Sequence, residues 1–281
     1  MPGHGISNSP FLNVMVGGGA TPDPDGLIFI AAEEAAGATF SPTQIAAINN
    51  LFLDLKGQGP NNSTTDFWTT NKVKRYWPLV GASAAPNAID VRLNTGVWAG
   101  GWTHSATGAK GNTINTLFNS GLSLQGEANF DWGFGYYGAE YTTGDWMCGI
   151  IDYSLSTGVW SIRYIGSSVI EYWNIGRGSA SASALTNLNF IGSRTGYGIG
   201  NDIYLRHNGT NTAFIGIGSP SGDTAVNMVF GNALDNFGGT YGANDMEYRS
   251  MYITYDITIA DSAILQTIDN AFQTALGRNT Y

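Results

Sequence analysis

The chain has 281 residues, 12% of them charged, with 39 Gly, 8 Trp, 14 Tyr and 13 Phe, a composition typical of turn-rich β proteins that excludes a disordered chain. The formal charge of −9 has the wrong sign for neutralising phosphates, so the sequence predicts no nucleic-acid binding. The opening stretch MPGHGISNSPFLNVMVGGG has no basic segment before a continuous apolar core, and no window approaches the roughly 18 apolar residues of a spanning helix, so we expect neither a signal peptide nor membrane insertion.

Residues 1–40 contain short apolar runs that glycine and proline interrupt, among them VGGGATPDPDG. Such a segment has too little apolar bulk for a core of its own and is ordered by what it binds. The sequence therefore predicts an N-terminal anchoring arm that docks onto other proteins.

Residues 42–56 carry the signals of a helix. Ser41 can cap it, Pro42 suits the first helical position, and Gln44 stands where a capping box needs it. Apolar residues then recur at helical spacing before Gly57, namely Ile45, Ile48, Phe52 and Leu55. We predict a helix here, within a helical connector over residues 41–87.

From about residue 88 the apolar pattern has a period of two, which predicts β-strands. The stretch NFDWGFGYYG places Phe130, Trp132, Phe134 and Tyr136 on one face of a strand. Two hairpins are predicted, around Gly166-Ser167-Ser168 and around Asn208-Gly209. Further strands are expected at 97–103, 146–153, 187–192, 226–230 and 248–257. Many short antiparallel strands without βαβ alternation favour a sandwich or jelly roll.

The chain closes with a predicted amphipathic helix. Asp261 can cap it, and one apolar stripe precedes Gly277, formed by Ile264, Leu265, Ile268, Phe272, Ala275 and Leu276. A stripe this continuous must be buried, and the β domain beside it is the nearest surface that can cover it.

Two stretches resemble a known family. The close, with YITYDITI, ADSAI and AFQTALGR, is similar to the end of concanavalin A-like (laminin G-like) lectin/glucanase jelly-roll domains, particularly those in structural proteins of phages and prophages of Bacteroidetes-type bacteria. The segment TTDFWTTNKVKRYWPLVGASAAPNAIDVRLN, followed by WTHSATGAKGNTINTLFN, resembles the region that precedes and opens this domain. The resemblance covers about residues 40–280. It implies a virion structural or adhesive protein, on a head or tail fibre, whose jelly roll binds glycans, and it implies no catalytic mechanism.

The residues do not form a recognisable catalytic pattern. Glucanases share the fold that the resemblance implies, and retaining enzymes need two carboxylates about 5–5.5 Å apart, which one strand face can supply. Glu140 and Asp145 are five residues apart and Asp131 stands alone among aromatic residues, so no such pair is present. Cys148, the one cysteine, lies in an apolar run and is interpreted as a buried small hydrophobe. We therefore predict that the chain is not an enzyme.

Two further motifs leave cofactor binding without support. Oxygen ligands at Asn201-Asp202, Asp235-Asn236 and Asn244-Asp245-Glu247 would suit Ca²⁺ if they converged, but Asx residues beside glycine also form turns. SRTGYGIGND lacks the glycine spacing and the following helix of a dinucleotide fingerprint, and is predicted to be a flexible inter-strand loop. No cofactor is predicted, and Ca²⁺ stays an open alternative.

Aromatic side chains in glycine-rich connections are the candidates for ligand recognition. Carbohydrate sites combine exposed Trp or Tyr rings with amide and carboxylate groups. The candidate ligand-binding residues are Trp98, Trp102, His104, Tyr197, Asp202, Tyr241 and Asn244. The three histidines are too dispersed for a ligand cluster or a triad. His104 lies in GGWTHSATGA, within the stretch that resembles the family, and this resemblance implies a structural or binding-loop role for it and not catalysis.

The expected architecture is mainly β: an anchoring arm over residues 1–40, a helical connector over residues 41–87, and an antiparallel concanavalin A-like β-sandwich with a C-terminal helix over residues 88–281. The expected function is a phage virion structural protein of the head or tail fibre or decoration type. It would be made in the host cytoplasm, form homo-oligomers, contact other virion proteins through the arm and attach to host-surface polysaccharide. The alternatives are a glycan-binding adhesin without a virion role and a glycan hydrolase.

Overall fold

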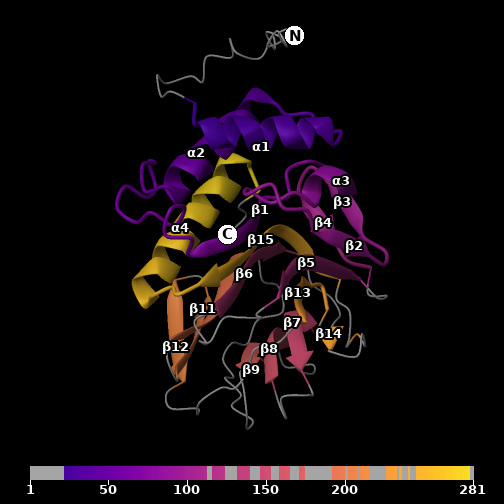
Figure 1. The fold of residues 1–281 in the computed structure, drawn as a ribbon, viewed down its shortest axis with the longest axis vertical. Coiled ribbons are helices and arrows are strands. Elements are labelled where there is room, and N and C mark those ends of the chain that lie inside the picture. Colours follow the sequence, from indigo (N-terminus) through magenta and orange to yellow (C-terminus); the bar gives the residue numbers. More distant parts are fainter. Residues whose placement is uncertain are drawn as a thin grey trace, which may run out of the picture.

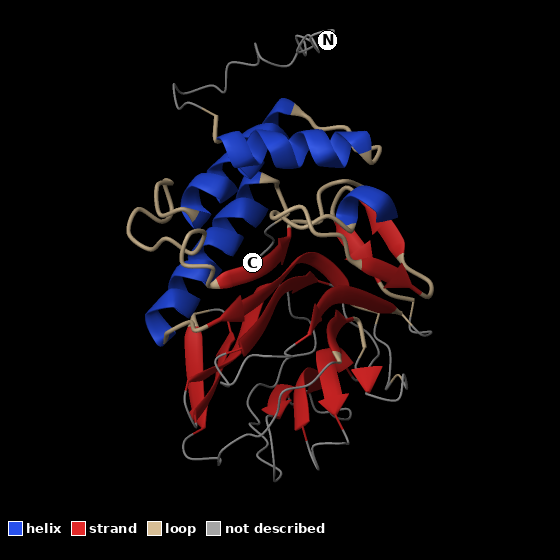
Figure 2. Cartoon of the chain, in the orientation of Figure 1, coloured by secondary structure: helices blue, strands red, loops and turns tan. Residues whose placement is uncertain are grey.

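The computed structural model describes residues 22–112, 116–123, 132–139, 146–152, 158–164, 171–174, 192–199, 202–207, 209–214, 226–232, 234–235, 240 and 245–278. In these residues the chain is mainly β, with two predominantly antiparallel sheets and a C-terminal helix, as predicted (Figure 2). No helix in these ranges is long and apolar enough to cross a membrane.

Within the described part of the chain, the first sheet has eight strands in the order β12-β11-β10-β6-β15-β4-β3, with β1 also pairing with β15. Their bounds are β1 Val73–Trp77, β3 Thr103–Ser105, β4 Gly108–Lys110, β6 Trp132–Ala139, β10 Gly192–Ile199, β11 Asp202–His207, β12 Thr210–Phe214 and β15 Glu247–Tyr255. Strand β15 is central: β6 pairs along one edge, and β4 and β1 pair with successive parts of the other.

The second sheet, as far as the structure describes it, has seven strands in the order β2-β5-β13-β7-β8-β9, with β14 pairing parallel to β7. Their bounds are β2 Val97–Ala99, β5 Leu117–Ser123, β7 Trp146–Asp152, β8 Gly158–Tyr164, β9 Glu171–Asn174, β13 Asn227–Phe230 and β14 Leu234–Asp235. The helices in the described residues are α1 Pro24–Ala35, α2 Pro42–Leu55, α3 Ala84–Asn87 and α4 Ile259–Ala275.

Two apolar cores hold these layers together. The first contains side chains from both sheets, such as Phe134 of β6 and Phe230 of β13, whose rings lie 6.2 Å apart. The second lies between the first sheet and the helices, and includes Phe52 of α2, Tyr252 of β15 and Leu265 of α4. The first sheet is therefore covered on one face by helices and on the other by the second sheet (Figure 1).

The two faces of strand β6 contribute differently to the two cores. Trp132, Phe134 and Tyr136 all enter the first core, as the alternation predicted, while Phe130 lies outside the described residues. On the opposite face, a Cβ at Gly135 would lie 1.9 Å from the ring of Tyr252. Glycine at this position therefore makes room for a tyrosine of the neighbouring strand.

Helix α2 confirms the prediction of a capped helix, since both hydrogen bonds of the Ser41–Gln44 capping box are present. Helix α4 begins earlier than predicted. Its N-cap is Thr258, and Asp261 is the third helical residue, whose carboxylate reaches back to the backbone N–H of Thr258. The prediction of Asp261 as the cap was therefore wrong, because the capping box has an earlier hydroxyl partner.

Helix α1 was not predicted. Asp23 caps it by accepting from the backbone N–H groups of Asp25 and Gly26, and Pro24 takes the first helical position. It packs on α2 through Phe29, whose ring centroid lies 5.7 Å from that of Phe52. The predicted division into arm, connector and sandwich stays a prediction.

A buried polar group fixes α4 to the first sheet. Asp269 Oδ1 accepts hydrogen bonds from the hydroxyls of Tyr76 at 2.7 Å and Ser250 at 2.6 Å, and from the side-chain amide of Gln273 at 3.3 Å. Burial raises the pKa of Asp269 although these donors oppose the shift. Because the donors come from β1, β15 and α4, they join three elements at one atom.

The predicted hairpins are consistent with the pairing. His207 pairs with Thr210, so two residues join β11 and β12; Gly209 has a φ of 86°, and Asn208 lies outside the described residues. Tyr164 of β8 pairs with Glu171 of β9. The loop predicted for SRTGYGIGND was wrong, because Gly192–Ile199 forms strand β10 between β6 and β11. Of the strand predicted at 187–192, residues 187–191 lie outside the described part of the chain.

Candidate functional site

Three of the predicted site residues lie together where the two sheets end. Trp98 is in β2, at one end of the second sheet, and His104 is in β3, at one end of the first sheet. Trp102 lies in the short connection that carries the chain from one sheet to the other. We name Trp98, Trp102 and His104 the edge cluster, and its strands are labelled in Figure 1.

The rings of the edge cluster pack mainly edge to face. The Trp98 ring centroid lies 4.9 Å from that of Trp102 and 4.6 Å from that of His104, with interplanar angles of 69° and 82°. Beneath them lie two further rings. The ring centroid of Phe118 of β5 is 4.2 Å from that of Trp98, and the ring centroid of Tyr248 of β15 is 5.9 Å from that of Trp102. All three residues of the cluster are partly exposed. The edge cluster therefore lies at the surface, with Trp98 and Trp102 packed against the first core.

The polar atoms of the cluster differ in their partners. Trp102 Nε1 donates to the carbonyls of Ala99 at 3.0 Å and Leu117 at 3.3 Å. Trp98 Nε1 is buried and has no hydrogen-bond partner among the described residues. The indole N–H of Trp102 is therefore satisfied by hydrogen bonds, whereas that of Trp98 is not.

Asn87 orients the imidazole of His104. Its Oδ1 accepts from the backbone N–H of Gly81 at 2.8 Å, which leaves its amide nitrogen as the donor to His104 Nδ1 at 3.3 Å. Burial lowers the pKa of His104, so the ring is neutral at pH 7 and carries its proton on Nε2. Asn87 was not predicted as a site residue, since an asparagine in AAPNA has no local signal beyond turn propensity.

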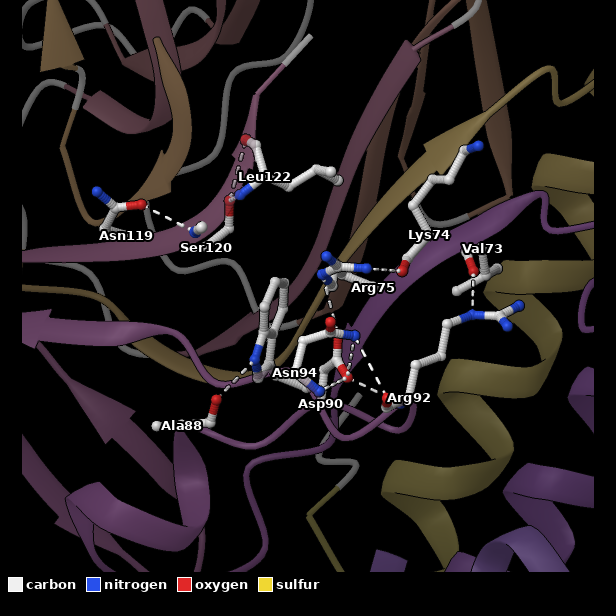
Figure 3. A network of polar contacts seen from close by, with 12 residues as sticks. Val73, Lys74, Arg75, Ala88, Asp90, Arg92, Asn94, Asn119, Ser120 and Leu122 are labelled. Carbon is white, nitrogen blue, oxygen red and sulfur yellow. Dashed lines mark hydrogen bonds and ion pairs between the residues drawn. The ribbon is translucent and has the colours of Figure 1, made fainter. Parts of the chain in front are cut away.

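A polar turn over residues 88–96 holds β2 in place. Asp90 is buried and accepts from the backbone N–H groups of Arg92 and Asn94, both at 2.8 Å, as Figure 3 shows. Arg75 Nε lies 3.1 Å from Asp90 Oδ2 as an ion pair without hydrogen-bond geometry. Burial raises the pKa of Asp90, while the charge of Arg75 and the backbone donors oppose that shift. The turn therefore anchors the segment that delivers Trp98 to the edge cluster.

The other predicted site residues are not part of this cluster. Tyr197 lies in β10 and Asp202 begins β11, where it pairs with Ile199. Strands β4, β15 and β6 separate β10 from β3 in the sheet, so these two residues lie far along it from His104. Tyr241 and Asn244 lie outside the described residues.

The calcium alternative has no geometric support in the described residues, where no three His, Cys, Asp or Glu side chains gather as metal ligands. Asp202 is in β11, Glu247 is in β15 and Asp235 is in the second sheet. Asp131, Glu140 and Asp145 of the hydrolase alternative lie outside the described residues. Cys148 has no exposed surface, as predicted.

A groove between α2 and α4 was not predicted. Its volume is about 410 Å³, and its lining residues are Ala47, Asn50, Leu51, Asp54, Pro60, Asn61, Ala271, Phe272, Thr274 and Ala275. The Asp54 carboxylate is already occupied, because it accepts from the backbone and side-chain amide of Asn61, both at 2.8 Å. The groove offers apolar side chains and the amides of Asn50 and Asn61, and the one carboxylate among its lining residues already has hydrogen-bond partners, so no charge is left to select a ligand.

The comparisons with known proteins indicate the fold. No protein-family model matches the chain, and no curated protein sequence matches it. Among solved structures, the chain is similar to a mutant of Trypanosoma rangeli sialidase displaying trans-sialidase activity, with a TM-score of 0.50 and 11% identity over 90% of this chain. The match covers 39% of that structure. At this identity the likeness concerns the fold alone.

Proposed function

We propose that this chain is a structural protein of a phage particle, of the head or tail fibre or decoration type. Its two sheets would form a concanavalin A-like sandwich, or jelly roll, that is displayed for assembly and for attachment to host-surface polysaccharide. In this proposal the protein is located in the virion, forms homo-oligomers and contacts other virion proteins through residues 1–40.

The observation that carries the proposal is the pairing of the two stretches that resemble phage-associated lectin-like domains. Strand β1 comes from the first stretch and β15 from the closing stretch, and they pair antiparallel with Tyr76 opposite Tyr252. Helix α4 of the closing stretch packs against the same sheet through the buried Asp269. Two segments that resemble the beginning and the end of one domain are therefore neighbours, which supports their belonging to a single unit of that kind.

Glycan binding at the edge cluster is supported by its chemistry. Partly exposed indole rings can pack against the C–H faces of a sugar, and the imidazole Nε2–H of His104 can donate to a hydroxyl. The likeness to a sialidase structure concerns the fold and is compatible with a glycan-related fold. It supplies no catalytic residue, so the proposal includes no catalytic step.

Immuno-gold electron microscopy on purified particles, together with mass spectrometry of their proteins, tests the virion proposal. An antibody against the folded chain should label a defined place on the particle. Absence of the chain from purified particles, with detection only in infected or host cells, would overturn the virion role and leave the adhesin alternative.

Glycan binding is tested separately on an array of surface polysaccharides with the purified chain. We expect saturable binding that Trp102→Leu or His104→Ala weakens by about tenfold or more. Trp68→Leu is the matched control, because Trp68 is also half-buried but packs with the helical core. Equal loss in all three variants, or no saturable binding by the unmodified chain, would argue against the edge cluster as the site. Release of free sugar from the array would instead favour the hydrolase alternative.

A further inference from the structure

Glu33 places a carboxyl group at the contact between α1 and the segment of residues 78–87. Its side chain has no exposed surface, and neither carboxyl oxygen has a hydrogen-bond partner among the described residues. A Cβ at Gly81 would lie 3.2 Å from Glu33 Oε2, so the carboxyl lies against the backbone of Gly81. Helix α1 also packs against α3, which ends this segment. The contact is therefore built around a polar group that no described residue satisfies.

The segment supplies no charge that could balance an ionised Glu33. Residues 78–87 read PLVGASAAPN and contain no titratable side chain. The guanidinium of Arg278 reaches the segment, but it donates to two of its backbone carbonyls, at 3.2 and 3.1 Å. His104 contacts the last residue of the segment, and burial lowers the pKa of its imidazole, so this ring is neutral at pH 7.

The helices supply no balancing charge either. The other titratable residues of α1, its cap and α2 are Asp23, Asp25, Glu34 and Asp54. Asp23 and Asp25 both pair with Lys56, and Asp54 accepts hydrogen bonds from amides. Burial alone shifts the pKa of Glu33, raising it from 4.5 to about 9. An ionised Glu33 would therefore be a buried charge without a described partner, which disfavours the docked helix.

The segment beside Glu33 is held in a conformation that costs energy. Leu79 has a φ of 50° and Ala82 a φ of 58°, left-handed values that are unfavourable for residues with a side chain. Between them, Gly81 donates its backbone N–H to Asn87 Oδ1 at 2.8 Å. Such a conformation persists only where the surroundings hold it, and α1 is one of the elements packed there. Loss of α1 should therefore let the segment relax and weaken its hold on Asn87.

Little apolar burial holds α1 in place. Phe29 and Ile30 are its large buried side chains, whereas Leu27 and Ile28 keep 46% and 53% of their surface exposed. Burying two such side chains favours the docked helix by roughly 10²–10⁴-fold. Above pH 4.5, holding the proton on Glu33 becomes tenfold less favourable for each pH unit, about 3 × 10⁴-fold by pH 9. The stabilisation from protonated Glu33 is complete below pH 4.5, and its loss exceeds the apolar hold before pH 9.

We propose that α1 is a pH-released cover of the segment of residues 78–87, which ionisation of Glu33 detaches as a unit while the two sheets and α4 remain folded. The second core keeps its members from α2, β1, β15 and α4 when α1 leaves, so the rest of the fold retains a core. Detachment frees the segment, and Asn87 then no longer holds the ring of His104. The proposal depends neither on the virion role nor on glycan binding, because each of its readouts is structural.

Pulsed hydrogen exchange on the full chain, read by mass spectrometry of peptides, tests the release. In a pulse at pH 9, the amides of α1 should exchange without protection while those of α4 and β15 stay protected. Glu33→Gln keeps the shape of the protonated acid and should leave α1 protected about a hundredfold or more above the parent. Glu34→Gln should behave as the parent. If α1 stays protected in the parent at pH 9, or loses protection together with α4, the proposal is overturned, and this decision needs no variant.

NMR of the His104 ring tests the second step. Burial lowers the pKa of His104, so the ring is neutral at pH 9 in each chain and its Nδ1 chemical shift reports the contact with Asn87. At pH 9 this shift should differ between the parent and Glu33→Gln, and should coincide between the parent and Glu34→Gln. The same shift in the parent and Glu33→Gln would overturn the release of Asn87.

Discussion

Glu33 should make the stability of this protein fall as the pH rises through neutrality. Its side chain has no exposed surface, and neither carboxyl oxygen has a hydrogen-bond partner among the described residues. Burial alone raises its pKa from 4.5 to about 9. The folded chain therefore holds a proton on Glu33 at neutral pH, while the unfolded chain does not.

The sign and size of the effect follow from this difference. Between pH 4.5 and about 9 the folded state binds one proton more than the unfolded state, so the free energy of unfolding falls by about 1.4 kcal/mol for each pH unit. The stabilising protonation is fully available below pH 4.5 and is lost as the pH rises through 9. At pH 7.5 the accumulated loss is about 4 kcal/mol.

Glu33→Gln tests this reasoning, because glutamine has the shape of the protonated acid and cannot ionise. The variant should match the parent protein near pH 4.5 and exceed its stability by up to about 4 kcal/mol at pH 7.5. Urea unfolding at half-unit steps from pH 5 to 8 measures the difference. Glu34→Gln, at the neighbouring and partly exposed position, is the control for a change in helix charge. A difference between Glu33→Gln and the parent that stays constant over this range would refute a protonated Glu33.

Three further substitutions test the packing of the first sheet and α4, each measured by chemical denaturation. Asp269→Ala should destabilise by about 3 kcal/mol or more, because it leaves the buried hydroxyl of Ser250 without its acceptor; a loss under 1 kcal/mol would contradict the role given to this carboxyl. Gly135→Ala should cost about 1–3 kcal/mol, because its Cβ would lie 1.9 Å from the Tyr252 ring; parent-like stability would mean that the ring moves freely. Thr258→Ala should cost about 1 kcal/mol through loss of the α4 cap, and an unchanged stability would indicate that the cap is replaced by water.

The elements that could be predicted from the sequence are those whose signals are local. The capping box and apolar spacing of α2 lie within fifteen residues, and the Asn-Gly dipeptide at 208–209 predicts the β11–β12 hairpin by itself. Helix α1 has apolar residues on both its buried and exposed sides, so no amphipathic period marks it, and the glycine and proline before it indicate a loop. Strand β10 escaped prediction for a similar reason, since its glycines are typical of turns but here lie between two partner strands.

The candidate site was predictable only in part because its assembly depends on sheet order. Trp98, Trp102 and His104 are close in sequence and meet where one sheet passes to the other. Tyr197 and Asp202 share the same kind of glycine-rich context, but three strands intervene in the sheet. No local pattern specifies that β15, from the end of the chain, inserts between β6 and β4, so the separation could not be read from the residues.

The segment from Pro78 to Asn87 couples the helical layer to the edge cluster. Arg278 at the end of the chain donates to the carbonyls of Pro78 at 3.2 Å and Leu79 at 3.1 Å. Leu79 has a φ of 50°, a left-handed conformation that costs energy for a residue with a side chain and persists only where its surroundings hold it. Asn87 then links the backbone of Gly81 to the ring of His104. Arg278 is therefore linked through this segment to Asn87, the partner of His104, so we expect a change at Arg278 to alter any binding at the edge cluster.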